Sequence, residues 1–289
     1  MTRVLNELVT LLALEKIEED LFRGQSQDLG WGQVFGGQVL GQALSAAVQT
    51  VASDRNVHSL HAYFLRLGDA RKPIVYSVDR VRDGQSFSTR SILAVQSGKP
   101  IFQMLASFQV EEQGVDHAEP MTEVVGPQGL LSERELWTKY AERLPEKIRT
   151  RATAERPIEL RPVDPVHPFA PEKRAPDSAV WVRTAGALPD DPALHRYLLA
   201  YCSDFAFLPT ALRPHGLTWV SPGMQIASID HAMWFHRPFR MDDWLLHVMH
   251  SPSASGARGM VRGSVFSSDG QLVASTAQEG LIRFRSGRE

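Results

Sequence analysis

The sequence predicts an α+β fold built from two copies of one unit, in which a buried helix is followed by an antiparallel sheet. The first observation is a repeat: His61-Ala62-Tyr63-Phe64 matches His231-Ala232-Met233-Trp234, 170 residues further along the 289-residue chain. The second is that both copies show the same order, a helical segment and then strand-like runs separated by turns. Residues 97–102 likewise parallel residues 268–273, 171 residues further along. A near-constant offset over a common order of elements indicates that one structural unit is duplicated.

The first unit covers residues 10–111. Residues 35–48 are small and apolar almost all round, which predicts a helix that is buried on most of its faces. Its glycines allow another backbone to approach, although each costs a helix about 1 kcal/mol. Strands are predicted at 75–81, 86–96 and 100–110, because such runs joined by glycine-containing turns are typical of an antiparallel sheet.

Residues 112–192 are predicted to form a linker that contains one short helix. They hold eleven of the 18 prolines, so little regular structure is expected, and none between residues 156 and 177. The exception is a capping box, in which Ser132 precedes Glu135 by three residues and begins a charged helix from 133 to about 144. Such a proline-rich stretch is typical of a connection that runs over the surface.

The second unit covers residues 193–286. A helix is predicted from 195 to 212, because large apolar side chains recur there and Pro209 lies near its end. Four predicted strands follow the helix, at 225–235, 244–250, 259–266 and 272–283.

Three polar residues of this second unit lie in apolar surroundings. Alternation places Gln278 on a face of small and apolar side chains in the last strand, where a buried amide needs hydrogen-bond partners. Alternation in the predicted strand over 225–235 places Ser228 and Asp230 on one face, and Asp204 is flanked by the large apolar residues of 205–208. Taken singly, Asp204 also fits a surface acid, and Ser228 and Gln278 also fit structural roles.

Composition excludes several classes of protein. Hydrophobic residues make up 43% and charged residues 22%, which excludes a mostly disordered chain, and the net charge of −2 gives no global attraction to nucleic acid or anionic membranes. The first 20 residues fit a short amphipathic helix better than a signal peptide, and no apolar run is long enough to span a membrane. The single cysteine, Cys202, fits a small core residue in a reducing compartment, and we expect a cytoplasmic protein.

Other types of site find no support in the sequence. Histidine pairs such as His58 and His61, or His231 and His236, lie on opposite faces of predicted strands, so no metal site is expected. Neither the glycine-rich motifs that cradle nucleotide phosphates nor the Gly-x-Ser-x-Gly elbow of serine hydrolases occurs.

Four motifs together resemble the acyl-CoA thioesterase II family: residues 31–38 (WGQVFGGQ), 58–64 (HSLHAYF), 229–239 (IDHAMWFHRPF) and 274–280 (ASTAQEG). They occur in the family's order, and the resemblance extends from about residue 10 to residue 285. It implies a double hotdog fold, in which two long helices are each wrapped by a curved antiparallel sheet. It also implies hydrolysis of acyl-CoA to free fatty acid and CoA, no cofactor, and a homo-oligomer, either a dimer or a tetramer.

The resemblance further implies a catalytic aspartate, a serine or threonine, and a glutamine, which map onto Asp204, Ser228 and Gln278. The repeat offset sets His58 opposite Ser228 and Ser107 opposite Gln278, so the first copy lacks the set. We therefore expect one active site per chain, with the first copy shaping the acyl pocket.

In the expected reaction, Asp204 accepts a proton from the attacking water, and Ser228 and Gln278 fix the geometry. A backbone N–H near Gly36-Gly37 is a candidate donor to the oxyanion. A covalent route through Asp204 or Ser228 stays open.

Two other functions fit the same fold class. One is an enoyl-CoA hydratase-like lyase, whose Gly-Asp-x-Asn-Pro-x-His segment does not occur here, Ile229-Asp230-His231-Ala232 being the nearest string. The other is a non-catalytic module that binds acyl-CoA or an acyl carrier. Steady release of free thiol from an acyl-CoA would separate hydrolysis from both alternatives.

Overall fold

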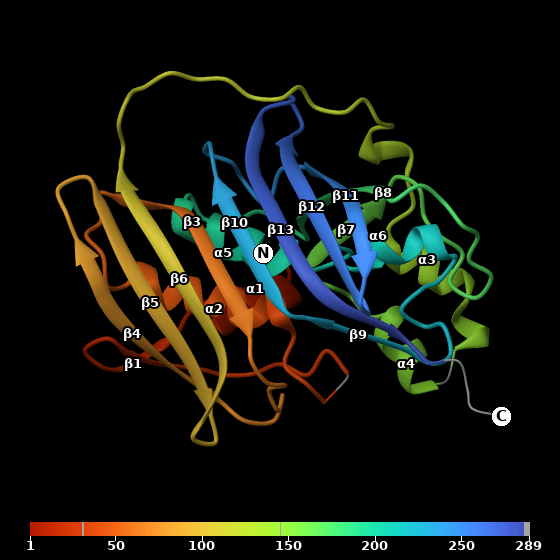
Figure 1. Cartoon of the computed structure of the whole chain (residues 1–289), viewed down its shortest axis with the longest axis horizontal. Coiled ribbons are helices and arrows are strands. Elements are labelled where there is room, and N and C mark those ends of the chain that lie inside the picture. Colours follow the sequence, from red (N-terminus) through yellow and green to blue (C-terminus); the bar gives the residue numbers. More distant parts are fainter. Residues whose placement is uncertain (31, 145, 286–289) are drawn as a thin grey trace.

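The computed structural model describes residues 1–30, 32–144 and 146–285. One large antiparallel sheet passes through the whole molecule, and two helices pack side by side against it (Figure 1). The predicted α+β class with two helix-and-sheet units is confirmed. The predicted end of the second unit at residue 286 lies outside the described residues.

The described residues of the first half form two helices and six strands. They are α1 (Arg3–Leu12), β1 (Glu15–Glu18), β2 (Leu21–Gly24), α2 (Gly36–Val48), β3 (Arg55–Phe64), β4 (Ile74–Asp83), β5 (Phe87–Gln96) and β6 (Lys99–Val110). The rest of the chain contains the other helices and strands. They are α3 (Glu133–Lys139), α4 (Glu146–Ala152), β7 (Ile158–Pro162), β8 (Asp177–Thr184), α5 (Pro192–Ser203), α6 (Pro209–Leu212), β9 (Met224–Ser228), β10 (Asp230–Phe235), β11 (Leu245–Ser255), β12 (Arg258–Ser267) and β13 (Leu272–Phe284).

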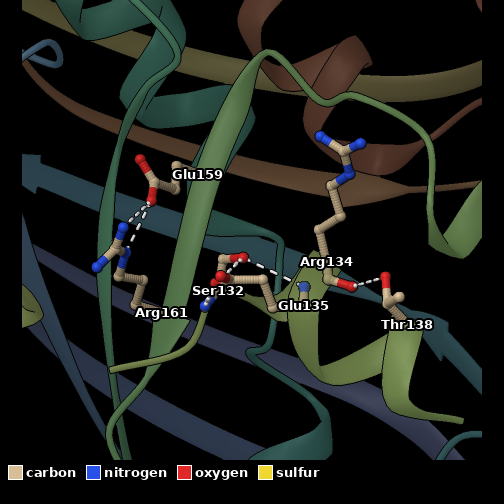
Figure 2. Close-up of a pocket in the computed structure, with 6 residues that line it drawn as sticks. All are labelled: Ser132, Arg134, Glu135, Thr138, Glu159 and Arg161. Atoms are coloured by element: carbon tan, nitrogen blue, oxygen red, sulfur yellow. Dashed lines mark hydrogen bonds and ion pairs between the residues drawn. The ribbon is translucent and has the colours of Figure 1, made fainter. Parts of the chain in front are cut away.

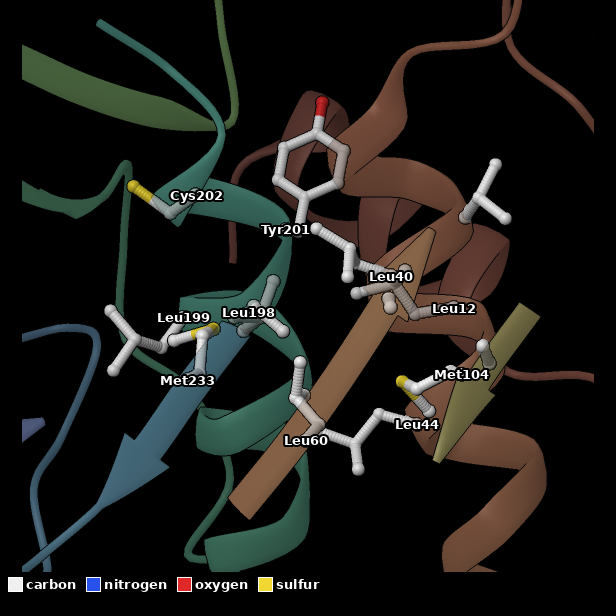
Figure 3. Close-up of a cluster of buried hydrophobic side chains, with 14 of the residues drawn as sticks. Leu12, Leu40, Leu44, Leu60, Met104, Leu198, Leu199, Tyr201, Cys202 and Met233 are labelled. Atoms are coloured by element: carbon white, nitrogen blue, oxygen red, sulfur yellow. The ribbon is translucent and has the colours of Figure 1, made fainter. Parts of the chain in front are cut away.

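The two central helices, α2 and α5, run antiparallel and touch through glycines of α2. A Cβ atom on Gly37 would lie 2.1 Å from the Tyr201 carbonyl oxygen, and one on Gly41 would lie 3.0 Å from the Tyr197 carbonyl oxygen. Any side chain at Gly37 would therefore push the helices apart. Leucines of both helices and methionines of the neighbouring strands fill the core around this contact (Figure 3).

The halves join where β3 pairs with β10 in the middle of the sheet (Figure 1). Leu60 pairs with Met233, and Ala62 pairs with His231. All four side chains are buried, and both strands shift register two residues before Leu60 and His231, so Leu60 corresponds to His231. This offset is 171 residues, one more than the match of His61 with His231 indicates. A shift of one residue moves a side chain to the other face of a strand, so that match related side chains on opposite faces.

The predicted helix over 195–212 and the predicted strand over 225–235 are both interrupted. Helix α5 ends at Ser203, Asp204 is its C-cap, and Ala206 adopts a positive φ of 59° before α6 begins. The strand breaks at Ile229, where its pairing with β13 shifts by one residue between Ser228↔Gly280 and Ala232↔Ala277. This bulge is the reason that Ser228 and His231, which differ in parity, both point to the helix side.

The middle segment contributes to the sheet, contrary to the prediction that 156–177 lacks regular structure. Strand β7 pairs with β8, and β8 pairs with β11 at the edge of the second half. The proline at residue 162 is tolerated because β7 is the last strand of the sheet. The capping box at Ser132 is confirmed, but α3 ends at Lys139 rather than near 144. The division into 10–111, 112–192 and 193–286 as domains stays a prediction.

Candidate active site

A cavity of about 850 Å³ opens beside the C-terminal end of α5. Its walls are largely apolar and come mainly from the middle segment and the second half. They include the side chains of Trp137, Leu160, Val180, Trp219, Ile226 and Met249. Of the described residues, the first half supplies only Val4, Glu7, Gln27, Asp28, Leu29 and Phe35. The first half therefore supplies a minor part of this wall, and the expectation that the first copy shapes the acyl pocket stays a prediction.

Asp204 lies on the cavity wall, where the end of α5 meets the start of α2. The Gly37 backbone N–H donates to Asp204 Oδ2 at 3.1 Å. A Cβ atom on Gly36 would lie 2.6 Å from the same oxygen, so the carboxylate fits there only because this residue is glycine. The Gly37 amide thus holds the carboxylate, and the donor to the oxyanion, which the sequence placed near Gly36-Gly37, stays unassigned.

Ser228 and Gln278 meet Asp204 from strands β9 and β13. Ser228 Oγ donates to Asp204 Oδ1 at 3.1 Å. Gln278 Nε2 donates to Asp204 Oδ1 at 3.1 Å and to Ser228 Oγ at 2.7 Å. Ser228 lines the cavity, whereas Gln278 is only 1% exposed. The structure thus brings the three predicted residues together, and their catalytic role stays a prediction.

Two residues that sequence reasoning missed complete this cluster. His231 Nδ1 lies 2.7 Å from Gln278 Oε1, and His231 Nε2 lies 2.9 Å from Ser203 Oγ. His231 is fully buried, and burial lowers the pKa of its imidazole. The sequence did contain a signal, because large apolar Met233 and Phe235 occupy the odd positions of the strand. An inward Ser228 then requires a bulge before His231.

Two groups considered from the sequence lie elsewhere. Burial raises the pKa of Asp230, whose Oδ1 accepts the Glu279 backbone N–H at 2.6 Å next to the bulge. His58 Nε2 lies 2.8 Å from Ser107 Oγ, in a pair that does not line the cavity. Burial raises the pKa of the Cys202 thiol to about 12, which fits the expected core role.

A second pocket of about 470 Å³ lies on the surface beside α3 (Figure 2). Its polar groups bond to one another: Ser132 and Glu135 form the capping box, and Arg161 pairs with Glu159. Across the described residues, no three His, Cys, Asp or Glu side chains are arranged to hold a metal ion. None of the described helices is both long and apolar enough to cross a membrane.

Comparison with solved structures defines the class of protein. The chain matches a hotdog-fold protein from Alicyclobacillus acidocaldarius with a TM-score of 0.77 at 20% identity, covering 97% of this chain and 99% of that one, which shows the fold. It also matches the crystal structure of an acyl-CoA thioesterase II from Mycobacterium marinum, with a TM-score of 0.80 and 40% identity over 97% of this chain and 100% of that one. The predicted double hotdog fold is confirmed.

Comparison with sequences defines the family. The family model described as acyl-CoA thioesterase matches residues 131–281, and that described as acyl-CoA thioesterase N-terminal domain matches residues 26–109. The chain is also 47% identical to acyl-CoA thioesterase 2 of Haemophilus influenzae, over 98% of this chain and 99% of that protein. The chain belongs to the acyl-CoA thioesterase family. The predicted class of enzyme, a thioester hydrolase, is confirmed over the lyase and the binding module.

Proposed function

We propose that the protein hydrolyses acyl-CoA thioesters to free fatty acid and CoA, and that Asp204, Ser228 and Gln278 activate the attacking water. The observation that carries this proposal is the convergence of the three side chains, from α5, β9 and β13, at the edge of a large apolar cavity. An ionised carboxylate accepts hydrogen bonds only, and three donors point at Asp204.

In the proposed reaction, water attacks the thioester carbonyl carbon while Asp204 takes its proton. The carbon–sulfur bond then breaks, and the proton passes to the leaving CoA thiolate. Ser228 donates to Asp204 and accepts from Gln278, so its own orientation is fixed and it can hold the water against the carboxylate. The Gly37 N–H holds the second carboxylate oxygen in place.

The acyl chain is proposed to occupy the apolar cavity. An aromatic group at its wall supports this, since Trp137 of α3 packs on Trp219 with ring centroids 5.5 Å apart. Phe205, which follows Asp204 in the chain, stacks on Phe35 with ring centroids 4.4 Å apart. Burying a hydrocarbon chain against such side chains contributes about 0.8 kcal/mol for each CH₂ group.

The test is release of free thiol from decanoyl-CoA by the wild type and by Asp204→Asn, which keeps the shape of the side chain and removes the base. We expect clear turnover by the wild type and a loss of about 10²-fold or more in the variant. Asp230→Asn is the matched control, because this half-buried acid accepts from the Glu279 backbone and does not line the cavity. Equal rates for Asp204→Asn and the wild type would contradict the proposal.

We also propose that the protein is cytoplasmic and forms a homo-oligomer. Tyr63 and Leu105 support the second point, because they are 59% and 48% exposed on the neighbouring strands β3 and β6. Light scattering after size-exclusion chromatography would show a dimer or tetramer for the wild type, and a monomer would contradict it.

A further inference from the structure

We propose that His231 is a positioning residue of this active site, which fixes the orientation of the Gln278 amide through its Nδ1–H. The inference rests on the proposed role of Asp204, Ser228 and Gln278. Its consequence is that the buried imidazole determines which end of the amide faces the carboxylate.

The amide of Gln278 has two ends with opposite hydrogen-bonding character. Its NH₂ group donates to Asp204 and Ser228, while its oxygen lies 2.7 Å from His231 Nδ1. Rotating the amide by half a turn would aim the oxygen at the carboxylate, where two acceptors would face each other. A donor at Nδ1 excludes that orientation, because it requires an acceptor opposite.

The state of the imidazole follows from its surroundings. His231 is fully buried, and burial lowers its pKa, so the ring is neutral with one N–H. That N–H lies on Nδ1, because the Asp204 carboxylate takes the amide NH₂ and leaves the Gln278 oxygen facing the ring. Nε2 is then an acceptor, 2.9 Å from the Ser203 hydroxyl, which also lies 2.9 Å from the Ala200 carbonyl oxygen and has one proton to share between the two. Ser203 is the last residue of α5 and directly precedes Asp204. The contacts therefore close a ring from Asp204 through Ser203, His231 and Gln278 back to Asp204.

The first half shows that the fold does not need this polar pair. Met233 pairs with Thr276 as Ala62 pairs with Met104, and Leu60 pairs with Ala106. Two residues toward the start of β10 and β3, and two toward the end of β13 and β6, His231 and Gln278 therefore correspond to Leu60 and Ala106. All four side chains are buried. One copy of the unit is built with an apolar pair at a position where the other buries an imidazole and an amide. Burying polar groups costs free energy, so their presence beside Asp204 indicates a role in the site.

The experiment compares two replacements of His231 in the full chain. His231→Leu copies the first half and removes the donor, whereas His231→Asn keeps an N–H near the position of Nδ1. We expect kcat for decanoyl-CoA to fall about 10- to 100-fold in the leucine variant with KM nearly unchanged, because misplacing a catalytic group slows the chemical step. The asparagine variant should regain most of that loss.

A double-mutant cycle separates positioning from a purely structural role. If His231 acts through Gln278, replacing it in a Gln278→Ala background should change kcat less than about twofold. His247→Leu is the matched control: His247 is also a buried histidine, on β11, three strands away from β10 in the sheet, and it bonds Thr276 rather than Gln278. Its kcat should stay within about twofold of wild type although the protein is destabilised.

Two results would overturn the inference. One is a folded His231→Leu enzyme with wild-type kcat. The other is an equal fall in kcat when His231 is replaced in the wild type and in the Gln278→Ala background. If the leucine variant does not fold, His231→Gln takes its place in the cycle. The amide of this glutamine reaches toward Ser203, so it provides no donor at the position of Nδ1. Wild-type rates in Asp204→Asn would contradict the proposed function itself, independently of the cycle.

Discussion

The carboxylate of Asp204 accepts hydrogen bonds from three donors, and each donor belongs to a different element of the fold. Gly37 belongs to α2, Ser228 to β9 and Gln278 to β13. The acid is therefore held before substrate arrives, which lowers the cost of reaching the reactive geometry. The Ser228 hydroxyl donates to Asp204 and accepts from Gln278, so the geometry of the set depends on this hydroxyl.

At Ser228, removing the hydroxyl should lower kcat more than a replacement that keeps it. Ser228→Ala should lower kcat for decanoyl-CoA about 10- to 100-fold, because Asp204 and Gln278 each lose a partner. Ser228→Thr keeps the hydroxyl and should stay within about tenfold of the wild-type kcat. Steady-state kinetics of the two purified variants checks both values. An alanine variant as active as the threonine variant would show that the hydroxyl has no part in the reaction.

At the scale of elements, the site depends on the close contact between the start of α2 and the end of α5. Gly36 leaves room for the carboxylate, and Gly37 lets the Tyr201 carbonyl approach. Neither glycine has a positive φ, so these residues are required for space rather than for backbone freedom.

Gly36→Ala should therefore damage activity more than stability. Its Cβ would meet Asp204 Oδ2 at 2.6 Å, so we expect kcat to fall about 10- to 100-fold as the carboxylate moves. Alanine also favours helix by about 1 kcal/mol, which offsets part of any destabilisation. The measurements are kcat and the urea midpoint, with Gly114→Ala as control because no atom lies within 4 Å of the added Cβ. Unchanged kcat in Gly36→Ala would contradict this packing.

The elements were predicted with unequal success, for physical reasons. Helix α2 and strands β4 to β6 have strong patterns of burial, and the sequence predicted them well. The break after Ser203 escaped prediction because apolar residues continue through it, so periodicity shows no interruption. The bulge at Ile229 changes one residue of register, and this small shift hid His231. Asp204, Ser228 and Gln278 were found through the family resemblance, since their distances depend on both breaks.

At the scale of the whole molecule, the two halves have diverged in what they bury. The second half holds His231 and His247 inside its sheet, whereas Leu60 of the first half corresponds to His231. The middle segment adds two strands and most of one cavity wall to the second half. The second half thus holds the polar cluster, and the first half contributes the N-terminal end of α2.

The buried histidines should make stability depend on pH. Burial lowers the pKa of His247 to about 3, whereas an unfolded histidine titrates near 6.5. Between these values the unfolded chain binds a proton that the folded protein does not, so the free energy of unfolding falls as the pH falls. From pH 7 to pH 5, this histidine should remove about 2 kcal/mol. Urea unfolding should show a correspondingly smaller loss in His247→Gln, and equal losses would contradict the assignment.

The position of the cavity predicts which part of the chain limits the length of the acyl group. Trp137→Ala should enlarge the cavity and shift kcat/KM toward longer acyl-CoA substrates, by about 10-fold between neighbouring lengths at most. Trp244→Ala is the control, because this indole stacks on Arg183 and does not line the cavity. Rates measured from butanoyl- to hexadecanoyl-CoA provide the comparison. An unchanged profile in Trp137→Ala would place the acyl chain elsewhere.

The central claim is that Asp204 directs water onto the thioester without an acylated enzyme. A single turnover, with enzyme in excess over decanoyl-CoA, tests this most directly when CoA and decanoic acid are both quantified after rapid quenching. We expect the two products to appear with one rate constant, and the intact mass of the protein to stay unchanged throughout. A burst of CoA ahead of the acid, with the acyl mass on a peptide that contains Asp204 or Ser228, would contradict it.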